Sequence, residues 1–369
     1  MLSTSVMLKP ASGNCNMRCS YCFYCDEMAN RAQSSYGFMS EETLKNVIRK
    51  TMLQTEQQIT YAFQGGEPTL RGLDFFKKAI EFQKKYNFKG IRVANVLQTN
   101  GYALNEDWCR FLKENNFLVG VSVDGTKELH DSFRRSADGK PTFNSITKSI
   151  QLLEKYKVDY NILTVVTEET AKHPAEIYRT FMKRGWYFQQ YIECLDPLGA
   201  CCASPYSLTP ETYGVFLTQL FDLWYADFKK GRQPYIRRFD NYVGMLAGFP
   251  PEACEQRGEC GIQLVVEADG SAYPCDFYVL DEYRLGNFNT DRLPQMNERR
   301  EEIGFIRRSH KLSAKCRSCP YFGLCRGGCQ RTRDYIPEED AYISHFCRSY
   351  QYFFDHCLDR LKEAAGHVR

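Results

Sequence analysis

The sequence has no long hydrophobic run, since none of its apolar stretches reaches the roughly 18 residues that a membrane-spanning helix needs. The N-terminal segment also lacks the basic region and the apolar core of a signal peptide. The formal net charge is +3 and charged residues make up 25% of the chain, so there is no basic excess of the kind that favours nucleic acid. We therefore expect a cytoplasmic protein that binds neither membranes nor nucleic acids.

Histidine is scarce, and none of the 6 histidines has the spacing of a metal-ligand pair. Cysteine is abundant: the chain has 17, an odd number in 369 residues. In a reducing compartment such a number indicates metal or redox chemistry rather than a disulfide-rich secreted protein. Two ordered arrays contain eleven of them, namely Cys15, Cys19 and Cys22, then Cys254, Cys260, Cys275, Cys316, Cys319, Cys325, Cys329 and Cys347.

Short apolar runs alternate with amphipathic stretches through the first two thirds of the chain. We predict strands at Val6–Lys9, Ile59–Gln64, Arg92–Gln98, Leu118–Val123, Tyr160–Val166 and Phe188–Leu195. We predict helices at about 41–54, 72–86, 105–116, 142–156, 174–184 and 210–230, the last with Thr209 as N-cap and Pro210 at its first position. Six β–α units in series predict an α/β fold with parallel strands, in which functional residues gather at the C-terminal strand ends.

The pattern changes after about residue 240, where cysteines become dense. One hairpin stands out: Gln263–Glu267 alternates, Asp269-Gly270 turns, and Ser271–Pro274 returns. We predict a small domain held together by metal and, at about 341–364, a final aromatic-rich helix. The expected domains are 1–235, 236–350 and 351–369.

The first cysteine array can supply three thiolates to a cubane [4Fe–4S] cluster, which leaves one iron without a protein ligand. The second array has eight thiolates, enough to ligate two further clusters completely. Zinc is the alternative at both places. Cys25 could close a zinc site at the first array, and the C-x2-C step of the second array fits zinc on its own.

The motif C-N-M-R-C-S-Y-C resembles that of the radical S-adenosylmethionine (SAM) enzymes. That resemblance implies a partial (β/α)6 barrel and a SAM molecule that chelates the open iron and yields a 5′-deoxyadenosyl radical. It also implies SAM contacts from the residues at successive strand ends, namely Tyr21, Gly65, Gly66, Glu67, Ser122, Asp124, Arg134 and Leu195. Each has a local alternative, because Gly65-Gly66 and Asp124-Gly125 are also turn signals.

The second array resembles the SPASM domain, an auxiliary-cluster domain found behind radical barrels. The resemblance implies one cluster on Cys254, Cys260, Cys275 and Cys329, and another on Cys316, Cys319, Cys325 and Cys347. Two closed clusters leave electron transfer or structural support as their role. We assign no role to the adjacent pair Cys201 and Cys202.

A closer resemblance, to the anaerobic sulfatase-maturating enzymes, covers about residues 5–360. Five segments resemble that family, namely Pro10-Ala11-Ser12, Tyr21-Cys22-Phe23-Tyr24, Phe63-Gln64-Gly65-Gly66-Glu67-Pro68-Thr69, Cys194-Leu195-Asp196-Pro197-Leu198 and Tyr273-Pro274-Cys275-Asp276-Phe277-Tyr278. The resemblance implies oxidation of a cysteine or serine to Cα-formylglycine in an unfolded sulfatase with a Cys/Ser-x-Pro-x-Arg motif. It implies Asp276 as the base, Tyr24 and Gln64 as substrate contacts, and a donor such as flavodoxin or ferredoxin.

Two other functions use the same modules. A maturase of ribosomal peptides would form thioether or carbon–carbon cross-links, and many such enzymes carry a peptide-recognition domain before the radical motif. We expect none here, because Cys15 comes early in the chain. A non-catalytic iron–sulfur carrier would not need a SAM pocket, and Gly65-Gly66-Glu67 argues against it.

Overall fold

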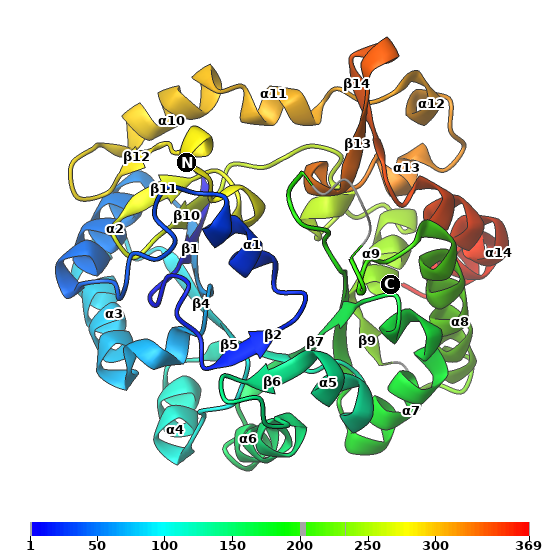
Figure 1. Ribbon diagram of the computed structural model, residues 1–369, viewed down its shortest axis with the longest axis horizontal. Coiled ribbons are helices and arrows are strands. Elements are labelled where there is room, and N and C mark those ends of the chain that lie inside the picture. Colours follow the sequence, from blue (N-terminus) through cyan, green and yellow to red (C-terminus); the bar gives the residue numbers. More distant parts are fainter. Residues whose placement is uncertain (1, 200–203, 233, 369) are drawn as a thin grey trace.

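The computed structural model describes residues 2–199, 204–232 and 234–368, so Cys201 and Cys202 lie outside the described residues. Its centre is one ten-stranded sheet in the order β12-β11-β10-β1-β3-β4-β5-β7-β8-β9 (Figure 1). The strands are β1 (Ser3–Leu8), β3 (Gln58–Phe63), β4 (Arg92–Thr99), β5 (Phe117–Ser122), β7 (Asp159–Val166), β8 (Phe188–Glu193), β9 (Tyr235–Ile236), β10 (Leu264–Val266), β11 (Ser271–Tyr273) and β12 (Gly286–Asn287). From β1 to β9 all neighbours are parallel, which confirms the predicted α/β barrel class.

Helices cover the outside of this curved sheet (Figure 1). They are α2 (Glu41–Gln54), α3 (Leu73–Tyr86), α4 (Glu106–Glu114), α5 (Lys127–Phe133), α6 (Phe143–Lys155), α7 (Pro174–Arg184) and α8 (Pro210–Phe228). Local signals set their ends: Asn105 and Thr209 accept the capping bonds of α4 and α8, as side-chain oxygens do at N-caps. The six predicted helices are confirmed, and α5 is a further helix among them that the sequence did not predict. None of the helices in the described residues is long and apolar enough to cross a membrane.

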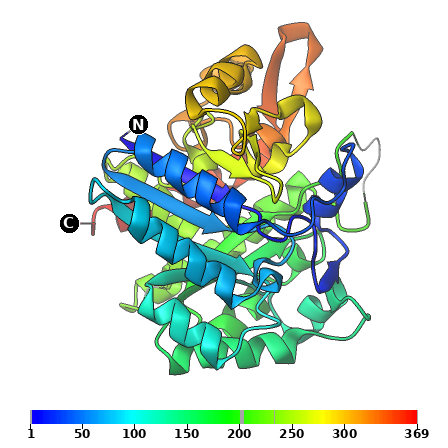
Figure 2. The same ribbon diagram turned by 90° about the vertical axis from the view of Figure 1, so that its left-hand side faces the viewer.

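The hairpin β10–β11 joins the barrel sheet directly. Strand β10 runs parallel to β1, with Leu8 opposite Val266, and the backbone N–H of Lys9 donates to the carbonyl of Val266 at 2.8 Å. The hairpin therefore brings the residues after β11, Cys275 and Asp276, to the edge where β1 ends. Figure 2 shows the later elements, coloured yellow to orange, lying along one side of the barrel.

Short elements make up most of the second cysteine region. They are α9 (Arg237–Leu246), α10 (Leu293–Glu302), α11 (Phe305–Ser309), α12 (Ala314–Arg317), α13 (Phe322–Cys325), β13 (Arg333–Ile336) and β14 (Ala341–Ser344). The prediction of a helix from about 341 is wrong at its start, because Ala341–Ser344 pairs with β13 as an antiparallel strand. Helix α14 (Cys347–Ala365) begins only at Cys347 and packs on α8 and α9 through buried rings such as Phe221, Phe239 and Phe353.

Candidate functional site

The first cysteine array lies in a loop at the C-terminal end of β1. Its middle part is strand β2 (Met17–Cys19), which pairs with β6 (Arg134–Ser136), so that Cys19 faces Arg134. Helix α1 (Phe23–Ala29) starts directly after Cys22. Burial raises the pKa of Cys15 to about 11 and that of Cys19 to about 12, whereas a hydrogen bond from Cys25 lowers the pKa of Cys22 to about 6.

Donor groups point at two of these sulfurs. The backbone N–H of Met17 lies 3.4 Å from the Cys15 Sγ, and the amide of Asn100 lies 3.7 Å from it. A guanidinium N–H of Arg134 lies 3.8 Å from the Cys19 Sγ. Such donors stabilise thiolates and suit the sulfur ligands of an iron–sulfur cluster. The loop therefore fits a cluster held by Cys15, Cys19 and Cys22, although their role as ligands stays a prediction.

Three of the predicted SAM contacts form one buried network beneath this loop. The Asp124 carboxylate accepts hydrogen bonds from the Tyr21 hydroxyl, from Arg134 Nε at 2.8 Å and from the backbone N–H of Val165 at 3.0 Å. The network ties the cysteine loop to strands β6 and β7. In this structure Asp124 therefore acts as an anchor of the loop, and its contact with ribose stays a prediction.

The Gly65-Gly66-Glu67 segment follows β3 and packs under the same loop. Glu67 is fully buried, and its carboxylate accepts from Thr69 and Thr99 side chains at 2.7 and 2.8 Å and from the Asn100 backbone N–H at 2.8 Å. Gly66 has a φ of 46°, and a Cβ there would lie 2.3 Å from the carbonyl oxygen of Asn14. A side chain at this position would displace the cysteine loop.

The two remaining predicted SAM contacts lie at neighbouring strand ends. Ser122 is the last residue of β5 and is buried, with 9% of its surface exposed. Leu195 comes two residues after β8 and is half-buried. Both stand at the same edge of the sheet as the cysteine loop, because parallel strands end together.

The second array divides into two groups of four thiols. In the first group, burial and then the charge of Cys329 raise the pKa of Cys275. Burial raises the pKa of Cys329 to about 12, and the charges of Cys254 and Cys260 add to the increase. These effects place Cys329 near the other three cysteines of the group.

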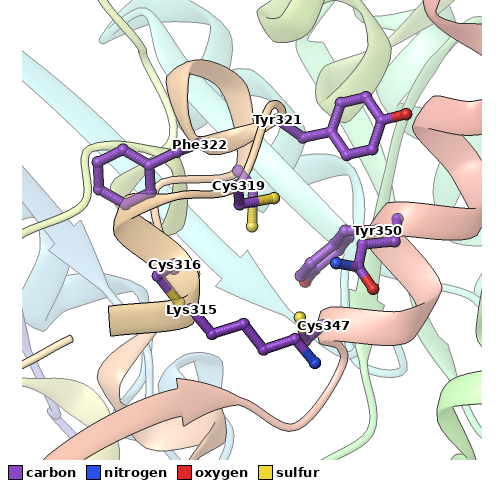
Figure 3. A pocket seen from close by; sticks show the side chains of 10 residues that line it. Lys315, Cys316, Cys319, Tyr321, Phe322, Cys347 and Tyr350 are labelled. Atoms are coloured by element: carbon purple, nitrogen blue, oxygen red, sulfur yellow. The ribbon is translucent and has the colours of Figure 1, made fainter. Parts of the chain in front are cut away.

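The second group lines a small pocket, with Cys316, Cys319, Cys325 and Cys347 among the residues around it (Figure 3). The rest of its lining includes Phe322, Tyr350 and the side chain of Lys315. Soft sulfur ligands suit an iron–sulfur cluster, so this pocket fits one. The cysteines of the second group thus line one pocket, and the division of the eight cysteines into two ligand sets stays a prediction.

Asp276 lies between the two arrays, directly after Cys275, and is buried with 6% of its surface exposed. Lys9 Nζ is 2.5 Å from Asp276 Oδ1, and Gln64 Nε2 donates to Asp276 Oδ2 at 2.7 Å. The Phe277 ring packs edge-on against Phe23 at 5.1 Å between ring centres. Asp276 is therefore fixed from both sides at the barrel mouth.

Tyr24 belongs to a second buried network next to Asp276. Its hydroxyl donates to Glu267 Oε1, which also pairs with Arg31 at 2.8 Å. Glu27 on α1 is buried too, and this burial raises its pKa to about 8. The Tyr24 hydroxyl is thus bonded to Glu267, whereas the Gln64 side chain is bonded to the predicted base, Asp276.

Sequence reasoning missed Lys9, Glu27, Arg31 and Glu267. A lysine at the C-terminal end of a predicted strand of a barrel was the one available signal, because functional side chains gather there. The other three have no motif, and long-range packing alone brings them together.

Comparison with protein families finds two matches. The model of the radical SAM superfamily matches residues 10–196, which is half of the chain. The model of an iron–sulfur cluster-binding domain, SPASM, matches residues 258–320. The two models thus cover the barrel with the first array, and part of the region with the second.

Whole-chain relatives agree with these matches. A cysteine-type anaerobic sulfatase-maturating enzyme of Clostridium novyi is 45% identical over 99% of this chain and 98% of its own length. A serine-type enzyme of Bacteroides thetaiotaomicron is 33% identical over 95% of this chain and 88% of its own. A solved structure of native anSMEcpe with bound AdoMet and the Cp18Cys peptide has a TM-score of 0.93 at 42% identity, with both chains fully covered.

Proposed function

The chain belongs to the anaerobic sulfatase-maturating enzymes of the radical SAM superfamily, and on this premise we propose that it oxidises a cysteine of a target sulfatase to Cα-formylglycine. The single observation that carries the proposal is the position of Asp276. It is a buried, ion-paired carboxylate at the barrel mouth, between the loop of the first array and a cysteine of the second. A base is needed at this place to remove the thiol proton of the substrate.

The cofactors of this reaction are three [4Fe–4S] clusters and SAM. We assign the first cluster to Cys15, Cys19 and Cys22, and the two auxiliary clusters to the two groups of four cysteines. When bound, the first cluster and SAM supply a 5′-deoxyadenosyl radical that takes one hydrogen atom from the substrate Cβ. The loop anchors Tyr21, Asp124 and Arg134 keep the cysteine array rigid at the site of this step.

The residues of the chain complete the oxidation. Asp276 takes the thiol proton as the carbon–sulfur double bond forms. A cluster held by Cys254, Cys260, Cys275 and Cys329 would accept the one electron that remains. Hydrolysis of the resulting thioaldehyde gives formylglycine and hydrogen sulfide. Gln64 donates to the second oxygen of Asp276, so the carboxylate keeps the same orientation from one turnover to the next.

Three finer assignments belong to the same proposal. Cysteine is the preferred target, because identity to the cysteine-type relatives is 45% and 43% but to the serine-type relative of B. thetaiotaomicron 33%. The partner is an unfolded sulfatase segment of the Cys-x-Pro-x-Arg kind, and the entering electron comes from a donor such as flavodoxin or ferredoxin. No disulfide joins cysteines within the described residues, which supports a reducing compartment, the cytoplasm.

The test uses the anaerobically reconstituted protein with dithionite, SAM and matched peptides that carry Cys-x-Pro-x-Arg or Ser-x-Pro-x-Arg. We expect 5′-deoxyadenosine by chromatography and an aldehyde, trapped by a hydrazide, on the cysteine peptide. Absence of both products would overturn the proposal. A cross-linked peptide without an aldehyde would instead favour a peptide maturase, and preferred oxidation of the serine peptide would reverse the cysteine assignment.

A further inference from the structure

Lys9 is the first residue after β1, and its side chain is completely buried. Lysine is almost never buried to this extent without a partner, because removing an ammonium group from water is costly. A role in packing alone would be served better by an apolar residue of the same length. The position of Lys9 therefore needs an explanation in terms of its charge.

The partner of this charge is Asp276. The Lys9 ammonium lies 2.5 Å from Asp276 Oδ1, with both side chains at most 9% exposed, and 3.8 Å from the centre of the Tyr24 ring. Gln64 donates to the other oxygen of Asp276. The two carboxylate oxygens are thus held by different strands, Oδ1 from the end of β1 and Oδ2 from the end of β3.

Neighbouring acidic groups do not compete strongly for Lys9. Glu267 is paired with Arg31 and accepts the Tyr24 hydroxyl. Burial raises the pKa of Glu27 to about 8, so this carboxyl is largely protonated at neutral pH. The charges in the network therefore balance in two pairs, Arg31 with Glu267 and Lys9 with Asp276.

The Gly65-Gly66-Glu67 segment leaves room for the Lys9 side chain. Gly65 has a φ of 89°, and a Cβ at this position would lie 2.8 Å from Lys9 Cγ. A residue with a side chain would therefore push against the stem that carries the ammonium to Asp276. Gly65 thus supports the ion pair in addition to its turn.

We propose that Lys9 is a positioning residue of the reaction, which holds the Asp276 carboxylate in the place where it accepts the proton of the substrate thiol. This inference rests on the proposed function. The proton moves from the thiol to Asp276, and the auxiliary cluster would accept the electron, as in the proposed function. Lys9 acts through Asp276 and not on the substrate.

The experiment compares wild type, Lys9→Met, Asp276→Asn and the double variant, each with its clusters reconstituted. Methionine keeps the length and apolar stem of Lys9 but removes the charge. We expect formylglycine turnover to fall by about 10- to 100-fold in Lys9→Met, in the range that a general base contributes, with the KM for peptide changed less than about threefold. We also expect 5′-deoxyadenosine to form still, so that the ratio of cleaved SAM to aldehyde rises.

The double variant gives the decisive measurement. If Lys9 acts through Asp276, adding Lys9→Met to Asp276→Asn will lower turnover little further, because the two residues work as a unit. Independent, multiplicative losses would overturn the inference, and so would wild-type turnover in Lys9→Met. Lys45→Met, which removes a lysine from a surface ion pair with Glu42, is the matched control and should keep full turnover.

The experiment also distinguishes a folding failure of Lys9→Met and a failure of the proposed function from a failure of the role of Lys9. If Lys9→Met does not fold, Lys9→Leu takes its place, because leucine also leaves Asp276 without a partner at this position, and it must show the same rise in the ratio of cleaved SAM to aldehyde. If wild type itself makes no aldehyde, the proposed function fails. An unaffected Lys9→Met beside an active wild type refutes the role of Lys9 alone.

Discussion

The two cysteine arrays are held in place by different means. Around the first, buried carboxylates of Glu67 and Asp124 accept hydrogen bonds from several segments of the barrel, so the protein itself shapes the loop. In the second, Cys316 and Cys325 lie on α12 and α13, helices of four residues each. Such short helices are not stable alone in water. We infer from this difference that the polypeptide preorganises the loop of the first array, and we predict that the second array needs its metal to hold its fold.

The largest expected difference between the arrays appears when one ligand is removed from each. Cys19→Ser should abolish 5′-deoxyadenosine formation, because the loss of one of three ligands at the open site leaves the cluster with two. Cys319→Ser should lose most formylglycine while SAM cleavage continues. Both products are measured by chromatography after anaerobic reconstitution. Equal loss of SAM cleavage in the two variants would contradict the separate roles of the arrays.

Removal of the clusters should separate the arrays by stability. After anaerobic chelation of iron, we expect amides in residues 314–329 to lose protection from hydrogen exchange by about 100-fold or more, because metal binding supplies their folding free energy. Residues 17–19, which pair with β6, should lose far less protection. The measurement is hydrogen exchange followed by mass spectrometry, with the reconstituted protein as control. A uniform loss across both regions would refute the comparison.

The same contrast explains how much the sequence could predict. Barrel helices such as α4 have a clear amphipathic pattern and a capping residue, Asn105, so their ends are predictable from local chemistry. The cysteine spacings give the sets of thiols that the structure brings together. Ala341–Ser344 misled the prediction, because its aromatic and apolar residues fit a helix as well as a strand, and pairing with β13 decides between them.

Long-range contacts were beyond prediction. Nothing in β1 or β10 taken alone indicates that Leu8 pairs with Val266, yet this pairing carries Asp276 to Lys9. The same holds for the contacts among Glu27, Arg31 and Glu267. These residues meet only when the hairpin extends the barrel sheet. The sequence therefore predicts cluster ligands and a base, but not the residues that contact the predicted base.

The preorganised loop can be weakened through Asp124. Asp124→Asn leaves Arg134 buried without its anion, and we expect a loss of about 3 to 5 kcal/mol in the free energy of unfolding. Asp355→Asn at the second array is the matched control. Asp355 is exposed and accepts from Tyr321, so its loss should cost less than about 1 kcal/mol. Denaturant titrations of the reconstituted proteins measure both, and equal costs would contradict a loop built on buried charge.

The smallest expected effect is a change in the pH dependence of stability, which comes from Glu27 beside the loop of the first array. Burial raises the pKa of Glu27 to about 8 from an ordinary 4.5, so the folded state keeps a proton that the unfolded chain has lost between these values. Stability contributed by neutral Glu27 is therefore complete below about pH 4.5 and declines as pH rises towards 8. From about pH 6 to 7.5 wild type should lose about 2 kcal/mol relative to Glu27→Gln, which cannot ionise. Denaturant titrations at both pH values measure this difference. Parallel pH dependence in the two proteins would show that Glu27 is already ionised, and Lys9 would then face two carboxylates instead of one.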